Sequence, residues 1–312
     1  MQYRQLGKSG LKVSALSLGS WLTLGEKLNL NEAESCINYA FEQGINFFDT
    51  AEVYGNGHAE LIMGETLKRF RREDVVVATK IFWSGEGPND IGLSRKHLIE
   101  GTRNSLRRLQ LDYVDLLFCH RPDPTTPIEE TVRAMDYLVR SGQVFYWGTS
   151  EWSAEQIAAA YEIAERLSCI PPTTEQSQYN LFHRQRIEQE FAPLYHKFGM
   201  GVIAFSPLAF GLLSGKYNEG IPENSRLALY PEWRSPDMEQ RLIKMKELAS
   251  VVKLSGYTLA QLAIAWCLKN QDVSSVIVGA SSLEQLNENL KALAIAEQLS
   301  SDILQQIERI LG

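Results

Sequence analysis

Short apolar runs alternate along this chain with longer segments in which apolar residues recur at helical spacing. Such alternation is typical of strand–helix units that build a parallel sheet. Because eight strands close a (β/α)₈ TIM barrel, we expect an α/β fold of that class. The eight predicted strands are Val13–Leu18, Ile45–Asp49, Val75–Lys80, Tyr113–His120, Val144–Thr149, Thr174–Gln178, Gly201–Ser206 and Ser275–Gly279.

Polar residues mark the starts of several helices between these strands. Asn31, Ser94, Ser153 and Ser282 each stand just before a segment of helical spacing. Asparagine and serine are preferred N-cap residues, because their side chains accept hydrogen bonds from the first turn. We therefore expect helices to begin directly after these four positions.

Two segments interrupt the regular alternation. Residues 3–13 alternate around a glycine-containing turn and predict a β-hairpin that covers the amino-terminal end of the barrel. Residues 207–236, after the seventh strand, are rich in glycine, proline and serine, and a segment of this length usually forms a functional loop or lid. With no linker or repeat in the chain, we expect residues 1–312 to form a single domain.

Composition narrows the classes of function. The chain has 312 residues, 44% of them hydrophobic, which is ample for a packed core. A net charge of -7 argues against a nucleic-acid or anionic-membrane surface. The polar start and the lack of a long apolar run predict no secretory signal and no membrane insertion, and hence a cytoplasmic protein. The cysteines and histidines lack metal-ligand spacing, so we expect no metal.

Three polar residues end predicted strands, and a fourth follows closely. Asp49, Lys80 and His120 each close an apolar run, and Tyr54 lies in the loop after Asp49. In a parallel barrel the carboxyl ends of all strands meet on one face, where catalysis takes place. We therefore expect these four side chains to lie together and to move or hold a proton.

Each of the four residues also has an ordinary structural interpretation. Asp49 could cap a helix, Tyr54 could cover a neighbouring loop, and Lys80 could extend its ammonium from the barrel rim into water. A single histidine such as His120 is commonly a hydrogen-bonded rim residue. Only their joint placement on one face favours a catalytic role.

The residues around Asp49 and Tyr54 carry a resemblance to a known family. The segment Gly44-Ile45-Asn46-Phe47-Phe48-Asp49-Thr50-Ala51-Glu52-Val53-Tyr54-Gly55 resembles the aldo-keto reductase superfamily, as do Lys80, the run Leu109–Leu117 before His120, and Gly279-Ala280-Ser281. Within it, the chain is most similar to the β-subunits of voltage-gated potassium channels. This similarity rests on the segments Arg121-Pro122-Asp123-Pro124, Tyr146-Trp147-Gly148-Thr149-Ser150, Ser206-Pro207-Leu208, Ser214-Gly215-Lys216-Tyr217 and Gln261–Leu268.

The resemblance implies reduction of an aldehyde or ketone by hydride from NADPH. Tyr54 would donate the proton, and the ammonium of Lys80 would stabilise its phenolate. Asp49 would keep Lys80 charged, and His120 would hold the carbonyl oxygen. The glycine-containing segment Gly55–Glu60 lacks the third glycine of a dinucleotide fingerprint, so we expect no Rossmann fold.

The resemblance also implies a set of cofactor-binding residues. Lys216 and Arg226 would bind the 2′-phosphate, and two cations at one phosphate favour NADPH over NADH. Taken alone, both would be solvated loop charges. Ser281, Gln285, Glu288 and Asn289 would surround the adenine. Phe205 would contact the nicotinamide, and Ser150 and Gln176 would hold its carboxamide. The remaining members of the set are Ser20, Trp21, Asp49, Ser206, Pro207, Leu208, Gly211, Ser214 and Gly279.

The family pattern departs at Glu151, which stands where the reductases usually carry asparagine and the channel subunits arginine. For the substrate, Trp21, Tyr54, Trp83 and His120 would line the cleft. Their aromatic surfaces suit an aromatic or short apolar aldehyde better than a charged sugar. Alternatively, the tryptophans only cover the barrel.

Three functions stay open from the sequence. The leading hypothesis is a cytoplasmic NADPH-dependent reductase of small carbonyl compounds. The second is a redox-sensing regulatory subunit of a potassium channel or other membrane partner. His120 stands where those subunits carry asparagine, and the barrel begins near residue 1, both of which favour the reductase. The third is an aldolase with Lys80 as a Schiff base. The resemblance further suggests a homo-oligomer, as in the tetrameric channel subunits.

Overall fold

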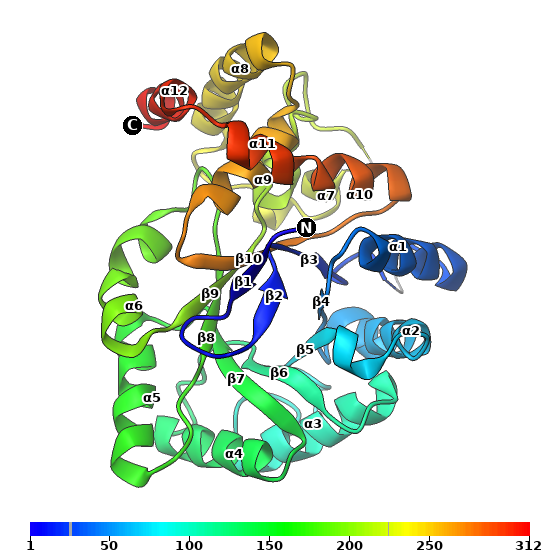
Figure 1. The fold of residues 1–312 in the computed structure, drawn as a ribbon, viewed down its shortest axis with the longest axis vertical. Helices are drawn as coiled ribbons and strands as arrows, with labels where there is room; N and C mark the ends of the chain where they lie inside the picture. The colour runs from blue at the N-terminus through cyan, green and yellow to red at the C-terminus, as the bar shows by residue number, and fades with distance from the viewer. Residues whose placement is uncertain (25–26, 224) are drawn as a thin grey trace.

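Eight parallel strands close into a barrel in the computed structural model, which describes residues 1–24, 27–223 and 225–312. Around the barrel the strands follow the order β10-β3-β4-β5-β6-β7-β8-β9, so the predicted (β/α)₈ fold is confirmed (Figure 1). The strands are β3 Leu16–Gly19, β4 Phe47–Asp49, β5 Val76–Ile81, β6 Val114–Cys119, β7 Val144–Ser150, β8 Thr174–Gln178, β9 Gly201–Phe205 and β10 Val273–Val278.

Helices surround this barrel, and their buried apolar residues form one core cluster with residues of the strands. They are α1 Leu30–Glu42, α2 His58–Leu67, α3 Arg95–Leu109, α4 Ile128–Arg140, α5 Ala154–Leu167, α6 Ala192–Phe198, α7 Arg226–Leu229, α8 Met238–Ser255, α9 Leu259–Lys269, α10 Leu283–Leu290, α11 Ala292–Gln298 and α12 Ser301–Leu311. Short helical turns are η1 Tyr54–Gly57, η2 Arg72–Asp74, η3 Arg186–Glu190, η4 Ala209–Ser214 and η5 Pro231–Trp233.

The predicted helix starts are correct at three positions. Ser94, Ser153 and Ser282 are N-caps whose side chains accept a hydrogen bond from the backbone N–H three residues later. The prediction for Asn31 is wrong, because α1 is capped by Asn29. The Asn29 side chain accepts from the backbone of Glu32, and the Glu32 side chain accepts from the backbone of Asn29. This reciprocal pair satisfies two donors at once.

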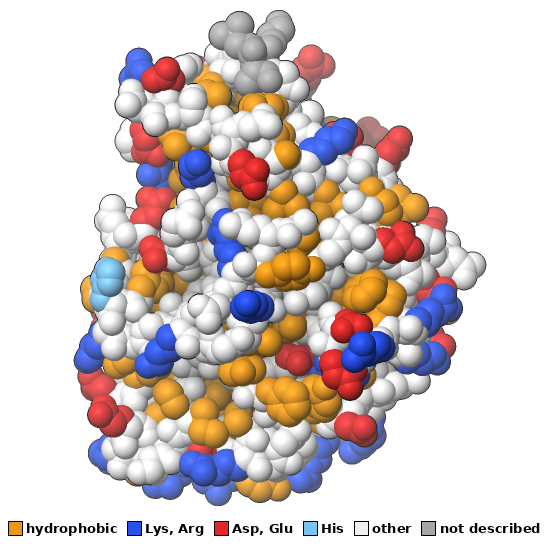
Figure 2. All heavy atoms as spheres, viewed as in Figure 1, with side chains coloured by type: hydrophobic (Ala, Val, Ile, Leu, Met, Phe, Trp, Pro, Cys, Tyr) orange, Lys and Arg blue, Asp and Glu red, His pale blue; other side chains and the backbone are white. Residues whose placement is uncertain are grey.

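The amino-terminal residues form the predicted hairpin. Strands β1 Tyr3–Gln5 and β2 Lys12–Ser14 pair antiparallel, and Leu6 and Val13 are fully buried among the inward-facing residues of the barrel. The hairpin therefore closes the amino-terminal end of the barrel and lies across its centre in Figure 1. Figure 2, drawn from the same direction, shows acidic and basic side chains interspersed on this face.

The hairpin also corrects the first predicted barrel strand. Val13 belongs to β2, and the barrel strand β3 starts only at Leu16. Between the two strands, the backbone N–H of Ala15 donates to the backbone carbonyl of Gln2, just before β1, while the carbonyl of Ala15 accepts from the backbone N–H of Val276 in the barrel. The other predicted strand boundaries agree with the structure to within two residues.

The segment after β9 is compact along most of its described length. It contains η4, α7 and η5, and so the predicted long loop is built of short helical pieces. Within residues 1–24, 27–223 and 225–312, no helix has the length and apolar character that crossing a membrane requires.

Candidate active site

Lys80 lies at the centre of a buried hydrogen-bonded group at the carboxyl end of the barrel. Its ammonium donates to Oδ2 of Asp49 at 2.5 Å and to the backbone carbonyl of Thr50 at 2.8 Å. A third contact, at 3.3 Å, joins Nζ to the hydroxyl of Tyr54. Strand β4 supplies Asp49, β5 supplies Lys80, and η1 supplies Tyr54. Hydrogen bonds thus join three of the four residues predicted to move a proton.

Gln176 holds the other oxygen of the Asp49 carboxylate. Its Nε2 donates to Oδ1 at 2.9 Å from strand β8, across the barrel from β4. With Lys80 on Oδ2, the buried carboxylate has a partner on each oxygen. Such pairing offsets the cost of burying a charge, and it fixes where the ammonium stands.

The charges of this group shift its pKa values. Burial by itself lowers the pKa of Lys80, but the attraction of Asp49 and Tyr54 outweighs it, so the pKa of Lys80 is raised. A protonated lysine is no nucleophile, which argues against the Schiff-base alternative.

For Tyr54, burial raises the pKa of the phenol, Asp49 adds to the rise, and Lys80 opposes it. The balance differs from the sequence-based expectation that Lys80 would dominate. Tyr54 therefore holds its proton, which is the form that a proton donor needs.

His120 follows β6 directly and faces the same group. Its ring centroid lies 5.7 Å from that of Tyr54 and 5.2 Å from that of Trp83. Burial, together with the charges of Lys80 and Arg121, holds the pKa of His120 well below its usual value. A neutral imidazole beside Tyr54 can donate one N–H to a substrate oxygen.

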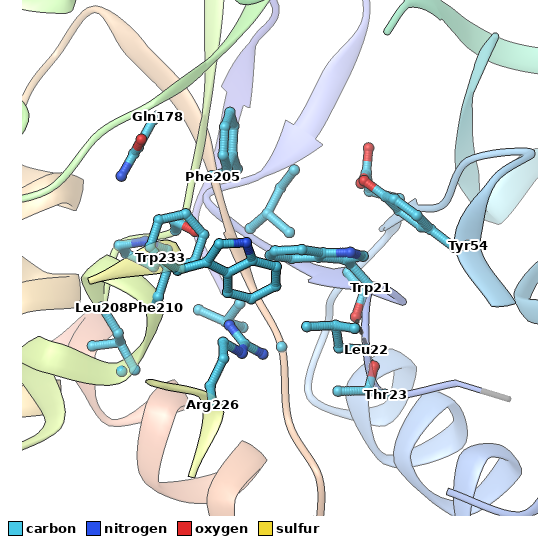
Figure 3. A pocket seen from close by; sticks show the side chains of 18 of the residues that line it. Trp21, Leu22, Thr23, Tyr54, Gln178, Phe205, Leu208, Phe210, Arg226 and Trp233 are labelled. Carbon is cyan, nitrogen blue, oxygen red and sulfur yellow. Dashed lines mark hydrogen bonds between the residues drawn. The ribbon is translucent and has the colours of Figure 1, made fainter. Parts of the chain in front are cut away.

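A cavity of about 800 Å³ opens at this end of the barrel. Asp49, Tyr54, Trp83 and His120 line it, and Figure 3 shows Tyr54 beside Trp21, with Phe205 and Arg226 on opposite sides of the Trp21–Trp233 pair. Most residues predicted to bind the cofactor line the same cavity, namely Trp21, Ser150, Gln176, Phe205, Ser206, Pro207, Leu208, Gly211, Ser214, Lys216, Arg226, Gly279, Ser281, Gln285 and Asn289.

Two residues of the predicted cofactor set do not line the cavity. The Ser20 hydroxyl is fully buried and donates to the hydroxyl of Thr50. The Glu288 carboxylate accepts from Gln261 at 2.9 Å and pairs with Lys291. Their side chains are thus engaged in packing β3 and α10 into the fold.

The cavity wall includes residues that sequence reasoning did not single out, among them Gln178, Phe210 and Trp233. Gln178 lies two residues after Gln176 on β8, so period-two alternation could have predicted that both face the barrel interior. Trp233 comes from η5 and packs against Trp21 with ring centroids 5.4 Å apart. No local pattern in the chain indicates this contact.

Glu151, the position at which the chain departs from the family pattern, makes hydrogen bonds and an ion pair with neighbouring residues of the protein. Its carboxylate accepts from the backbone of Gln178 at 2.7 Å and from the hydroxyl of Ser177 at 3.1 Å. Arg186 completes an ion pair at 2.8 Å. The acidic side chain therefore ties the end of β7 to the end of β8.

Comparison with known proteins agrees with this geometry. A family model described as the aldo/keto reductase family matches residues 15–311. A protein of Arabidopsis thaliana named "Probable voltage-gated potassium channel subunit beta" is 53% identical over 317 aligned positions, which cover 100% of this chain and 97% of that protein. A rice protein (Oryza sativa subsp. japonica) with the same name is 51% identical, with the same coverage of both chains.

Proposed function

The chain belongs to the aldo/keto reductase family, and on this basis we propose that it reduces small aldehydes or ketones with NADPH, with Tyr54 as the proton donor. The contact of the Lys80 ammonium with both the Asp49 carboxylate and the Tyr54 hydroxyl carries this proposal. Bound NADPH supplies the hydride in such chemistry.

The residues of the site divide the remaining work. Tyr54 and His120 donate to the carbonyl oxygen of the substrate, where negative charge develops during reduction. Tyr54 then gives up its proton, and the adjacent Lys80 ammonium stabilises the phenolate left behind. Asp49, held by Gln176, keeps that ammonium in place. Trp21 and Trp83 supply apolar walls that limit access of water to the reacting carbonyl.

The cavity fits NADPH in size and in the chemistry of its walls. Cofactor sites usually enclose about 300–1,000 Å³, a range that includes this cavity. Lys216 and Arg226 offer two cations for a phosphate monoester, and the start of α10 adds Ser281 and Gln285. Ser150 and Gln176 offer a hydroxyl and an amide for the carboxamide. These features support NADPH as the cofactor.

Single-turnover oxidation tests the proposal directly. The full chain is loaded with NADPH and mixed with excess 4-nitrobenzaldehyde, and cofactor oxidation is followed by the loss of NADPH fluorescence. Because only bound cofactor is observed, the rate of hydride transfer is separated from cofactor release. Oxidation within seconds supports the reductase, whereas tight binding without oxidation over hours refutes it.

The shifted pKa values predict how this rate depends on pH. Because the pKa of Tyr54 is raised, the phenol stays protonated up to at least the pH of an ordinary tyrosine pKa. Because the pKa of His120 is lowered, the imidazole stays neutral even at pH values below an ordinary histidine pKa. We therefore expect a plateau from about pH 6 to about pH 9, with the rate falling only above about pH 10. Single-turnover rates measured across this range check the prediction. A descending limb centred near pH 7 would contradict it.

A second candidate function is a redox-sensing subunit of a membrane partner. The names of the Arabidopsis and rice relatives favour it. In that case NADPH binding would be tight and turnover slow, and a channel would co-purify in fixed proportion from the native source. The proposal further includes a cytoplasmic location and a homo-oligomeric assembly of the chain.

A further inference from the structure

We propose that Arg121 makes this site selective for carbonyl substrates that carry a carboxylate, such as aryl aldehydes with an acidic substituent. The inference rests on the reductase function proposed above and names its substrate class. Arg121 follows His120 directly, is half-buried, and lines the cavity. Its guanidinium carbon lies 5.8 Å from the centre of the Trp83 ring, which itself packs against His120.

The guanidinium of Arg121, a residue that lines the cavity, keeps hydrogen-bond donors available. Its Nη1 donates to the carbonyl of His120 at 2.6 Å and makes a long contact of 3.4 Å to the hydroxyl of Ser150. Among the residues that the structure describes, Nε and Nη2 have no hydrogen-bond partner. These two nitrogens form the edge of the fork that can bind both oxygens of a carboxylate.

No carboxylate of the described residues neutralises Arg121. Asp49 and Glu151 are the acidic residues of the cavity wall, and they pair with Lys80 and Arg186 instead. Asp123, two residues along the chain, turns its carboxylate to the backbone of Leu93 and to the hydroxyls of Thr125 and Thr126. The positive charge of Arg121 therefore acts inside the cavity: it adds to the burial and Lys80 effects that lower the pKa of His120, and it slightly opposes the burial that raises the pKa of Tyr54.

The other cations of the cavity have different partners in the proposed function. Behind the cavity wall, Lys80 is committed to Asp49 and Tyr54. Lys216 and Arg226 come from the loop after β9, where they suit the cofactor phosphate, and Lys27 lies exposed at the cavity rim. Arg121 alone among these five follows His120 and stands beside the Trp83 wall of the substrate cleft. An anion on the substrate would supply the partner that this charge lacks.

Aromatic walls and one arginine together define the substrate. Trp21, Tyr54 and Trp83 offer flat apolar surfaces for an aromatic ring, and Arg121 offers a charged fork at their edge. The sequence predicts an aromatic or short apolar aldehyde in preference to a charged sugar, and Arg121 narrows that class. The aromatic part of that preference is kept, but an acidic substituent is added.

Matched pairs of substrates test this inference. Each of 2-, 3- and 4-formylbenzoate is compared with the formylbenzamide of the same substitution, which has nearly the same shape but no charge. The readout is the ratio of kcat/KM for acid over amide, with NADPH saturating. Because hydrogen bonds to charged groups are strong, we expect a ratio of about tenfold or more for at least one isomer. High salt should reduce it.

Substitutions then locate the source of the preference. Arg121→Gln should bring the ratio close to one, and Arg121→Lys should keep part of it, since a lysine retains the charge but loses the fork. Arg71→Gln removes an exposed arginine elsewhere on the chain and should leave the ratio unchanged. A general loss of activity or stability lowers kcat/KM for acid and amide alike, so it cancels in the acid-to-amide ratio.

Each other outcome is decisive. If the wild-type protein reduces the amides but favours no acid, the substrate class is wrong and the reductase function stands. A preference that survives in Arg121→Gln overturns the assignment to Arg121. If NADPH is bound but neither acids nor amides react, the proposed function fails, and the inference fails with it.

Discussion

Replacing Tyr54 by phenylalanine should slow single-turnover oxidation of NADPH by about 10²- to 10⁴-fold, the range that a general acid contributes. The substitution removes one hydroxyl and leaves the ring that packs 6.4 Å from Trp21. It takes away the donor of the proton and a hydrogen-bonding partner of Lys80, while Asp49 and the Thr50 carbonyl still hold the ammonium. NADPH binding should therefore change little, and the loss should fall on the rate of hydride transfer.

A matched control separates this effect from a general one. Tyr137 is 46% exposed on α4, outside the cavity, and Tyr137→Phe should keep the wild-type rate. Rates from rapid mixing and cofactor affinities from fluorescence titration are measured for both variants. Equal rates for Tyr54→Phe and the wild-type protein would remove Tyr54 from the mechanism.

Replacing Arg226 by glutamine should weaken NADPH binding by about 10- to 100-fold, as expected from the loss of a charge-assisted hydrogen bond to phosphate. Arg226 begins α7 and places its guanidinium 5.2 Å from the centre of the Trp21 ring. NADH lacks the 2′-phosphate and should lose less affinity, so the preference for NADPH over NADH should shrink. Lys216→Gln should act in the same direction.

Titration of both cofactors against each variant checks this second prediction. Lys246→Gln, at an exposed position of α8, serves as the control and should leave both affinities unchanged. If the affinities for NADPH and NADH fell equally, Arg226 would support the loop through its contact with Trp21 and would not bind the 2′-phosphate.

Much of the barrel could be predicted because its pattern is local. Each strand is a short apolar run, and Asp49, Lys80 and His120 stand where those runs end, so the rule that strand ends converge was enough to place them together. The start of α1 was misplaced because Asn29 and Asn31 are both good caps. Only the pairing with Glu32 decides between them, and it favours Asn29.

The parts that could not be predicted depend on contacts between distant segments. Ser20 and Glu288 turn away from the cavity because Thr50 and Gln261 hold them, and neither partner is close in the chain. Trp233 lines the cavity because its ring packs against Trp21 and Phe210. The centroid of the Trp233 ring lies 5.4 Å from that of each of these two rings. Side-chain direction on a long loop is set by such packing, which no spacing in the sequence encodes.

The hairpin at the closed end of the barrel affects how this chain can diverge over evolutionary time. Leu6 and Val13 fill the barrel interior from the amino-terminal end, so substitutions there act on stability and are removed by selection for folding. The loops at the opposite end carry Trp83, Arg121 and Trp233, which line the cavity. Relatives of this protein can therefore acquire new substrates by changing those loops, while the same plugged barrel is inherited without change.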